Sequence, residues 1–357
     1  MIHKSVFCYL SFFAFFLYHV ISKGYNNSER LITRMELINS VSRTQNDERT
    51  IAGILRRPVL IKRFKSQRML LLFLMPGFLA VVVFNYLPMV GILMAFEDYK
   101  PLKGFLRIEF VGFRYFAMFL KDPYFYEALK NTIGISFFSL VFGFPAPIVL
   151  ALLIDSIRNL KFKKITQTIT YLPHFISWVV IACLVYRILD VDSGILNIVL
   201  SAFGKEPVRF ISTPEYFWTI LIVTSILKEV GWGSIIYLAA IAGIDPELYS
   251  AAVVDGASRF KRLVYLTLPG IAPTVVLMLI LSIGSLVTSN FDAVFNLSNP
   301  LVLSSAEVIE TYVLRTGVML GRYSFSTAIG FTQSVISFIL VFIGIRLSKK
   351  YNDYAVI

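Results

Sequence analysis

Long apolar runs alternate with short polar segments along this chain, and six of the runs are long enough to cross a bilayer as helices. A helix needs about 20 mainly apolar residues to span the hydrocarbon core. Gly143, Pro145 and Pro147 predict a kink in the second run, because proline removes a backbone donor and crowds the preceding turn. The pattern predicts an all-α membrane protein with a six-helix core. The expected spans are residues 69–96, 132–154, 171–189, 217–242, 273–291 and 325–347.

An earlier apolar run, residues 5–21, is shorter and very aromatic. No small-residue cleavage site follows it, which disfavours a removed signal peptide. Three interpretations stay open: an uncleaved signal-anchor, one extra N-terminal membrane helix, or an extension upstream of a true start at Met35. The sequence divides into an N-terminal segment, 1–68, and a transmembrane domain, 69–357.

Basic residues flank the spans in a way that sets their orientation. Residues 54–68 carry six basic side chains and no acid, and further basic clusters lie at 158–164 and 346–350. Lys and Arg accumulate on the cytoplasmic side of membrane proteins, so both ends of the core are expected inside. The mixed charge of residues 97–130, expected outside, weakens this assignment without reversing it. The 54–68 flank is expected either to lie on anionic membrane lipid as an amphipathic helix or to be a solvated tail.

Composition agrees with an integral membrane protein and excludes other classes. The chain is 57% hydrophobic and 16% charged, against about 25% charged in soluble domains. The net charge of +12 follows from the flanks of the spans, so nucleic acid is not an expected partner. Two cysteines and three histidines are scattered and show no metal-ligand or disulfide pattern.

A polar, amphipathic segment, residues 245–273, separates two of the apolar runs. Asp245 suits an N-cap, Pro246 the first helical position and Glu247 the positive end of the helix dipole. Gly256 interrupts the helix, and residues 258–268 are expected to be helical again until Pro269. Two short helices joined by a tight corner are therefore expected outside the bilayer.

This segment resembles the coupling loop of inner-membrane permeases of ATP-binding-cassette (ABC) importers. The family pattern is Glu-Ala-Ala, then Asp-Gly-Ala, then an aromatic residue and Leu-Pro. Ser250 stands where the family usually has Glu, so an ion pair from that carboxylate to the ATPase is in doubt. The resemblance covers residue 69 to the C-terminus and not the first 68. The matching residues are Ala251, Ala252, Asp255, Gly256, Ala257, Phe260, Leu268 and Pro269.

An aromatic-rich external segment, 111–132, is similar to the carbohydrate branch of that family, which includes maltose-type and lipoprotein-B-like polysaccharide permeases. The resemblance implies half of a translocation pathway for an oligosaccharide. It implies four kinds of partner: a second permease subunit, two ATPase subunits, an extracytoplasmic binding protein and membrane lipid. A different rather than an identical second permease is favoured. The implied location is the bacterial cytoplasmic membrane, multi-pass, with the C-terminus cytoplasmic.

The resemblance also implies a chain that is not an enzyme. No G-x-x-x-x-G-K-[ST] loop is present to hold nucleotide phosphates, so this chain is expected to bind no cofactor and its partners to use ATP. In the implied mechanism Asp255 caps or braces the corner and Gly256 permits the turn. Ala251 and Ala252 would pack against the ATPase, and Phe260 would anchor in its groove.

Polar groups inside the apolar runs are candidates for the pathway, because lipid-facing ones are costly. Lys228 and Glu229 are adjacent, so each is expected to need its own partner or a cavity. Trp232 shares a face with both and suits either a sugar ring or packing. Asn290, Asp292 and Asn296 are expected to close the fifth span at the external mouth, or to form an ordinary loop. The candidates are Asn85, Ser177, Trp178, Lys228, Glu229, Trp232, Ser285, Ser289, Asn290, Asp292 and Asn296.

Two other functions fit less well. An ion-gradient-driven secondary carrier needs embedded acids and usually an internal repeat, and the sequence indicates only Glu229 and no repeat. A membrane enzyme, such as a lipid-linked glycosyl transferase, needs clustered acids or a metal site. Both leave the pattern of residues 251–269 unexplained.

Overall fold

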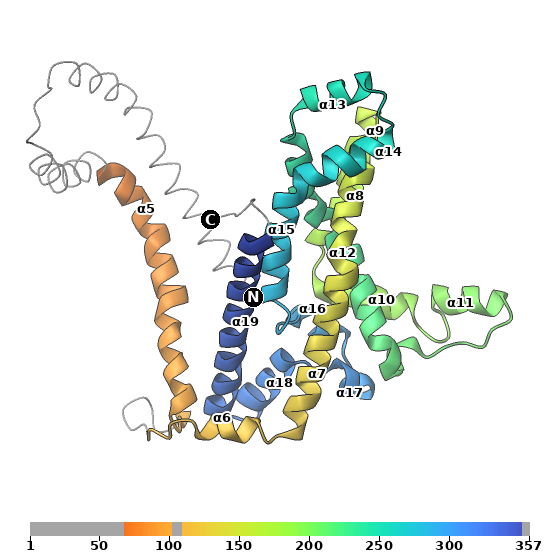
Figure 1. The fold of residues 1–357 in the computed structure, drawn as a ribbon. Coiled ribbons are helices and arrows are strands. Elements are labelled where there is room, and N and C mark those ends of the chain that lie inside the picture. The colour runs from red at the N-terminus through yellow and green to blue at the C-terminus, as the bar shows by residue number, and fades with distance from the viewer. Residues whose placement is uncertain (1–67, 102–108, 352–357) are drawn as a thin grey trace, which may run out of the picture. The chain divides into compact units, whose positions relative to one another are not determined.

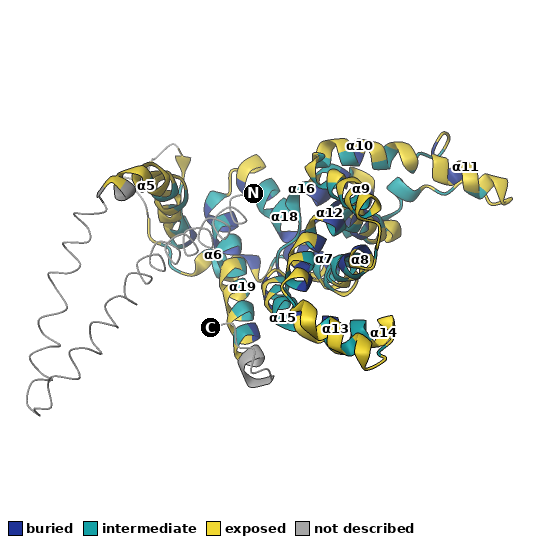
Figure 2. Cartoon of the chain, turned by 90° about the horizontal axis from the view of Figure 1, so that it is seen from above, coloured by how far each residue is buried: buried dark blue, intermediate teal, exposed yellow. Residues whose placement is uncertain are grey.

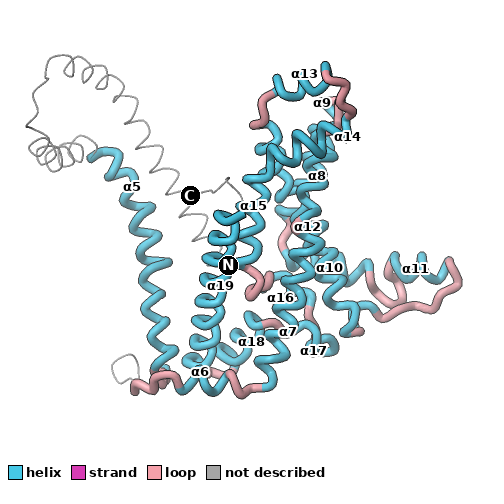
Figure 3. The backbone as a smooth tube through the Cα atoms, in the orientation of Figure 1, coloured by secondary structure: helices cyan, strands magenta, loops and turns pink. Residues whose placement is uncertain are grey.

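The computed structural model describes residues 68–101 and 109–351, so the apolar run 5–21 and nearly all of the basic flank 54–68 lie outside the described residues. Within those ranges every regular element is a helix, apart from a single bridge between Glu97 and Phe110 (Figures 1 and 3). The prediction of an all-α membrane protein is confirmed. Contacts divide the chain into two units, Met1–Gly91 and Ile92–Ile357, which are described separately.

The first unit holds α5 (Arg68–Val81), the π-helix η1 (Val82–Tyr86) and the start of the 3-10 helix η2 (Leu87–Phe96). Leu72–Phe96 is long and apolar enough to cross a membrane. Its large side chains, such as Phe73 and Phe84, are mostly exposed. A helix that is apolar on all sides belongs in lipid or against another chain.

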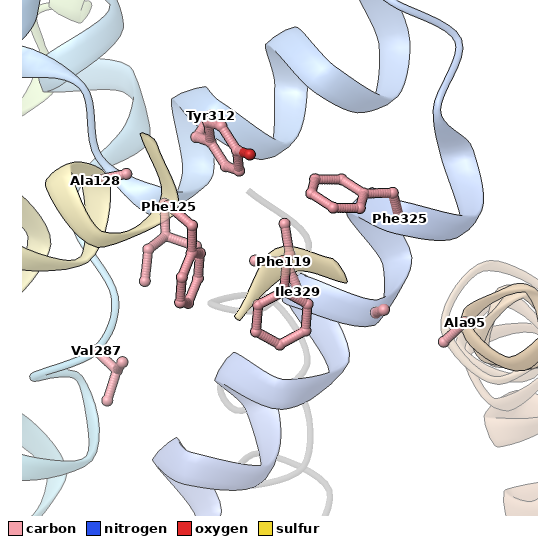
Figure 4. Close-up of a cluster of buried hydrophobic side chains, with 10 residues drawn as sticks. Ala95, Phe119, Phe125, Ala128, Val287, Tyr312, Phe325 and Ile329 are labelled. Atoms are coloured by element: carbon pink, nitrogen blue, oxygen red, sulfur yellow. The ribbon is translucent and has the colours of Figure 1, made fainter. Parts of the chain in front are cut away.

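In the second unit the long helices lie side by side (Figures 1 and 2). Helix α12 packs against α8 and α15, and α15 packs against α19. Aromatic and aliphatic side chains from α6, α7, α18 and α19 form one core, with Phe119, Phe125, Tyr312, Phe325 and Ile329 at its centre (Figure 4). The α-helices are α6 (Arg114–Phe119), α7 (Pro123–Phe138), α8 (Pro145–Asp155), α9 (Leu160–Tyr171), α10 (Trp178–Ile188), α11 (Ile195–Ala202), α12 (Pro214–Ala242), α13 (Pro246–Val254), α14 (Arg259–Arg262), α15 (Leu268–Gly284), α16 (Phe291–Leu297), α17 (Leu303–Ala306), α18 (Ile309–Leu314) and α19 (Tyr323–Tyr351); the shorter elements are η4 (Ser139–Gly143), η5 (Leu172–Phe175), η6 (Phe210–Ser212), η7 (Leu263–Thr267), η8 (Pro300–Val302) and η9 (Arg315–Met319).

Five helical stretches in the described residues are long and apolar enough to span a membrane, and the number is six if one bent pair counts as a span. The second begins at Pro123, nine residues before the expected start, because Asp122 caps its first turn. Its predicted kink is present as the π-helix η4 just before Pro145. Such a π-turn shifts the hydrogen-bond register where proline cannot donate.

The third expected span, 171–189, is wrong as one straight helix. The chain instead forms α9 with η5, then turns by 101° into α10. Ile176 is extended, and Ser177 caps α10 by accepting from the Val180 backbone N–H at 3.4 Å. We call residues 173–177 the break.

The fifth expected span is shifted toward the N-terminus. It runs from Arg259 to Gly284 rather than over 273–291. Pro269 does not end the preceding helix, because the π-helix η7 leads directly into α15 with proline in its first turn. Asn290, Asp292 and Asn296 therefore do not close this span; they belong to the separate helix α16 and its cap.

An ion pair between a partly exposed arginine and a buried carboxylate ties α17 to the end of α18. The Arg315 Nε and Nη2 atoms donate to the two Glu307 carboxylate oxygens at 2.7 and 2.8 Å, and Glu307 is only 9% exposed. Next to it, the Asn131 amide donates to the Ser304 and Glu307 carbonyls. These bonds fasten the start of the second span to α17.

Replacing Arg315 by Met should destabilise the protein by about 2 kcal/mol, because it leaves the Glu307 carboxylate buried without its partner. Pairing Arg315→Met with Glu307→Leu should recover most of that loss, since no charge is then left uncompensated. Thermal unfolding in detergent compares the single and double variants. Equal stability of wild type and the Arg315→Met variant would show that the pair contributes nothing.

A second polar contact lies outside the candidate spans, between η2 and α6. The Tyr115 hydroxyl donates to the Asp98 carboxylate at 2.6 Å, and Lys100 pairs with the same carboxylate at 3.0 Å. The Tyr115 hydrogen bond, followed by Lys100, lowers the pKa of Asp98. Burial and then the bond to Asp98 raise the pKa of Tyr115 to about 12.

We expect Tyr115 to remain neutral at pH 11, where an ordinary tyrosine is ionised. Because its folded pKa lies above the ordinary value of 10.0, its contribution to stability is complete below pH 10 and is lost as the pH rises through about 12. A phenolate absorbance titration of wild type minus the Tyr115→Phe variant isolates this group. Ionisation of the isolated group near pH 10 would contradict the contact.

Candidate functional site

The corner segment, residues 245–273, starts as its sequence predicts. The Asp245 carboxylate accepts from the Glu247 backbone N–H at 2.9 Å, and Pro246 occupies the first turn of α13. The helix ends in a paired cap: Ala257 N–H donates to Ala252 O at 2.9 Å and Gly256 N–H to Val253 O at 3.0 Å. Gly256 has φ +74°, a backbone region that side chains with a Cβ adopt at a cost. The expected tight corner at Gly256 is therefore present.

Tyr249 and Thr267 tie α13 to the helical stretch Arg259–Gly284 that follows the corner. The Tyr249 hydroxyl lies 2.9 Å from the Thr267 hydroxyl, which is buried. Asp255 sits at the end of α13, where its backbone N–H contributes to the cap. Its carboxylate is exposed and makes no hydrogen bond to any described residue, so Tyr249 and Thr267, rather than this carboxylate, brace the corner.

The outer surface of the corner segment is apolar and basic. Figure 2 shows α13 and α14 largely as exposed residues. Phe260 is 75% and Val254 87% exposed, and Arg259 and Lys261 are exposed beside them. Exposed apolar side chains gathered on one protrusion typically mark an interaction site. The other expected contact residues divide into exposed (Ser250, Ala251, Leu268, Pro269) and partly buried (Ala252, Ala257) positions.

A second group of functional side chains meets where the break lies against the middle of α12. Lys228 is buried, and its Nζ donates to His174 O at 2.6 Å and Pro173 O at 3.3 Å. A helix end leaves carbonyls without intrahelical partners, and a cation satisfies them well. Glu229 Oε1 lies 3.7 Å from the same Nζ. Each of the two charges thus contacts its own atom of His174, and the two also form an ion pair with each other.

The ring of His174 completes this group. Its Nδ1 lies 2.7 Å from Glu229 Oε2, and its face is stacked on Trp232 with centroids 4.4 Å apart and planes within 2°. Phe175 meets the same indole edge-on, and Lys228 Nζ lies 5.7 Å from the Trp178 ring. We call His174, Phe175, Trp178, Lys228, Glu229 and Trp232 the midspan cluster.

The remaining pathway candidates lie elsewhere. Ser289 donates to the Glu310 carboxylate at 2.8 Å, and Gln333 donates to that carboxylate too. Asn290 caps α16, and the Asn296 amide donates to Asp292 O, so these groups serve local structure. Ser285 and Ser177 sit at helix ends, and Asn85 belongs to the first unit.

Several members of these networks are not indicated by the sequence. His174 is there one of three scattered histidines with no expected role, although a Pro-His pair before a Ser cap could have signalled a helix break. Two acids between the candidate spans are also not indicated by the sequence: Glu307 is buried, and the Glu310 carboxylate accepts from Ser289 and Gln333.

A cavity of about 700 Å³ lies between α7, η4, α12 and α17. Phe138, Phe142 and Trp218 form much of its apolar lining, with Lys130 and Glu215 among its charged residues. None of its lining residues belongs to the midspan cluster. Among the described residues no group of His, Cys, Asp and Glu has the arrangement of a metal site.

Comparisons with known proteins place the whole helical bundle in one family. A model of the family described as "binding-protein-dependent transport system inner membrane component" matches residues 69–352. Protein LplB of Bacillus subtilis (strain 168) is 41% identical over 289 residues, which cover 81% of this chain and 91% of LplB. The polygalacturonan/rhamnogalacturonan transport system permease protein YteP of the same organism is 41% identical over 298 residues, 84% of this chain and 92% of YteP.

Solved structures agree with these relatives. A chain in the crystal structure of a bacterial ABC transporter involved in the import of the acidic polysaccharide alginate superposes with a TM-score of 0.76 at 38% identity. The match covers 82% of this chain and 99% of that chain. The chain described here belongs to the family of inner membrane components of binding-protein-dependent transport systems.

Proposed function

We propose that this chain is the permease subunit of an ATP-driven importer that receives a carbohydrate, most simply an oligosaccharide, from an extracytoplasmic binding protein. The observation that carries the proposal is the corner segment: a rigid, capped turn that presents Phe260 and Val254 to solvent and is fastened by Tyr249 and Thr267 to the span that follows. A protrusion that is rigid and continuous with a span can transmit a push from a docked partner into the membrane.

The partner that fits this protrusion is an ATP-binding-cassette ATPase. The sequence contains no G-x-x-x-x-G-K-[ST] loop, which supports ATP hydrolysis by separate subunits rather than by this chain. Two ATPase subunits and a second permease would complete the transporter. This assignment places the corner segment and the C-terminus in the cytoplasm, in agreement with the basic flanks.

The carbohydrate substrate is supported by two observations. The relative named for polygalacturonan and rhamnogalacturonan transport is 41% identical to this chain, and the chain of the alginate importer is 38% identical. In the midspan cluster, Trp232 is 45% exposed, and His174 contacts both its ring and the Glu229 carboxylate. An aromatic face next to a hydrogen-bond acceptor suits a sugar ring, which has an apolar face and a rim of hydroxyls.

The test is to co-purify the chain with its chromosomally neighbouring transporter subunits and measure ATP hydrolysis with binding protein loaded from a panel of oligosaccharides. The panel contains digests of polygalacturonan, rhamnogalacturonan and arabinan, and alginate oligosaccharides. Stimulation by one digest supports the proposal and narrows the substrate. An isolated chain that associates with no ATPase subunit would overturn the importer assignment.

A further inference from the structure

We infer that His174 is a positioning residue of the translocation pathway, which orients the Glu229 carboxylate and the Trp232 indole as one sugar-contacting surface. This inference rests on the proposed function, since it names a residue that acts through the two proposed contacts. His174 lies in η5, just before the chain turns into α10, whereas Glu229 and Trp232 come from the middle of α12. The surface exists only because the break lies against α12.

The imidazole holds both partners at once. Its Nδ1 engages Glu229 Oε2 at 2.7 Å, while its face covers one side of the Trp232 ring at 4.4 Å. An imidazole nitrogen and a carboxylate oxygen at this distance share one hydrogen bond. The ring is therefore fixed by two perpendicular constraints, an in-plane hydrogen bond and an out-of-plane stack, and its partners are fixed in turn.

The contact determines which oxygen of Glu229 remains free. With Oε2 engaged by His174, Oε1 lies 3.7 Å from Lys228 Nζ, beyond hydrogen-bonding distance. The Glu229 side chain is 42% exposed, so Oε1 is available to a substrate hydroxyl. Without the imidazole, the carboxylate is free to swing onto Lys228 and draw that ammonium away from the His174 and Pro173 carbonyls. His174 thus keeps the Lys228–Glu229 ion pair at 3.7 Å and the Lys228 ammonium on the two carbonyls of the break.

The charged and titratable groups around the imidazole are few. Glu229 and Lys228 contact His174 from α12, and the nearest titratable groups along α9 and α10 are Tyr171, the exposed Cys183 and Tyr186. A ring stacked on an indole shields that face of the indole from solvent and from a dissolved quencher. The chain has three tryptophans, so a Trp178→Phe/Trp218→Phe background leaves Trp232 as the one reporter.

The first arm measures quenching of Trp232 fluorescence by added acrylamide in that background, with the full chain purified in detergent without partner subunits. Because the imidazole covers one face of the Trp232 ring, His174→Gln should increase quenching by about twofold or more, whereas His174→Phe, which keeps a ring there, should leave it unchanged. Equal quenching in the His174 protein and the His174→Gln variant would overturn the inference.

The second arm measures sugar transported per ATP hydrolysed, with binding protein loaded from a digest of polygalacturonan and rhamnogalacturonan. His174→Phe keeps the stack and removes the hydrogen bond; His174→Gln keeps a donor and removes the stack. Both should lower transport per ATP by about fivefold or more while stimulated hydrolysis stays within about twofold of wild type. Unchanged transport per ATP in both would refute a positioning role.

A loss of positioning should lower transport while hydrolysis is kept. If both variants instead lower transport and hydrolysis together, His174 supports folding, and the positioning role is refuted. A digest that fails to stimulate the wild-type complex counts against the proposed substrate class, and the fluorescence arm then decides the role of His174 by itself.

Discussion

Alanine in place of Phe260 should abolish most of the substrate-stimulated ATP hydrolysis of the assembled transporter. Phe260 is 75% exposed at the tip of α14, with no described partner in its own chain large enough to cover it. If it inserts into a groove of the ATPase, truncation to alanine removes about 3 kcal/mol of association energy, or roughly 150-fold in affinity. Little of this loss should appear in the stability of the chain itself, because an exposed ring contributes little to folding.

The matched control is Phe203→Ala. Phe203 is 79% exposed at the end of α11, which points away from the corner segment in Figure 1. Stimulated hydrolysis and co-purification of the ATPase subunit are measured for both variants at equal membrane levels. Full coupling in the Phe260→Ala variant, or equal loss in the Phe203→Ala variant, would contradict the assigned role.

Alanine at Gly231 should prevent the native packing of α12 against the end of α9. A Cβ atom at this position would lie 1.9 Å from the Thr170 carbonyl oxygen and 2.4 Å from its carbon. Both atoms are backbone, so the two helices must separate, and the neighbouring Lys228 bonds to the break would lengthen. We expect a loss of about 3 kcal/mol or more, at the upper end of overpacking.

Gly330→Ala is the control for a helical glycine. A Cβ at Gly330 of α19 would meet nothing within 4 Å, so this change should be neutral or stabilising by up to about 1 kcal/mol. Thermal unfolding and the monodisperse fraction on size-exclusion chromatography in detergent distinguish the two. A Gly231→Ala variant as stable as the Gly330→Ala variant would show that the close approach of α9 and α12 is absent.

Features that depend on local chemistry could be predicted from the sequence. The start of α13 is set by the Asp245 cap and by Pro246 in the first turn, and the corner is set by the positive φ of Gly256. Each of these features depends only on residues that are neighbours in the sequence. The apolar runs likewise predict which segments form the long helices, since a segment must be about 20 mainly apolar residues long to cross a membrane.

The break at residues 173–177 could not be predicted in this way. Hydrophobicity is continuous through it, and its carbonyls are satisfied by Lys228, which lies more than 50 positions later in the chain. The sequence pattern predicts a helix end at Pro269, but in the structure the π-helix η7 continues directly into α15, which contains Pro269 in its first turn. The Glu307–Arg315 and Ser289–Glu310 contacts join short helices whose pairing is tertiary, so no sequence spacing indicates them.

The most direct test of the central claim, that the corner segment docks onto an ATPase, is photocrosslinking from Val254. A photoreactive amino acid replaces Val254, which is 87% exposed, or the control Phe203, and the assembled complex is irradiated with and without ATP. The account predicts a crosslink to the ATPase subunit from position 254, with a yield that changes with ATP, and none from position 203. No crosslink from position 254 in a complex that still imports its substrate would contradict the account.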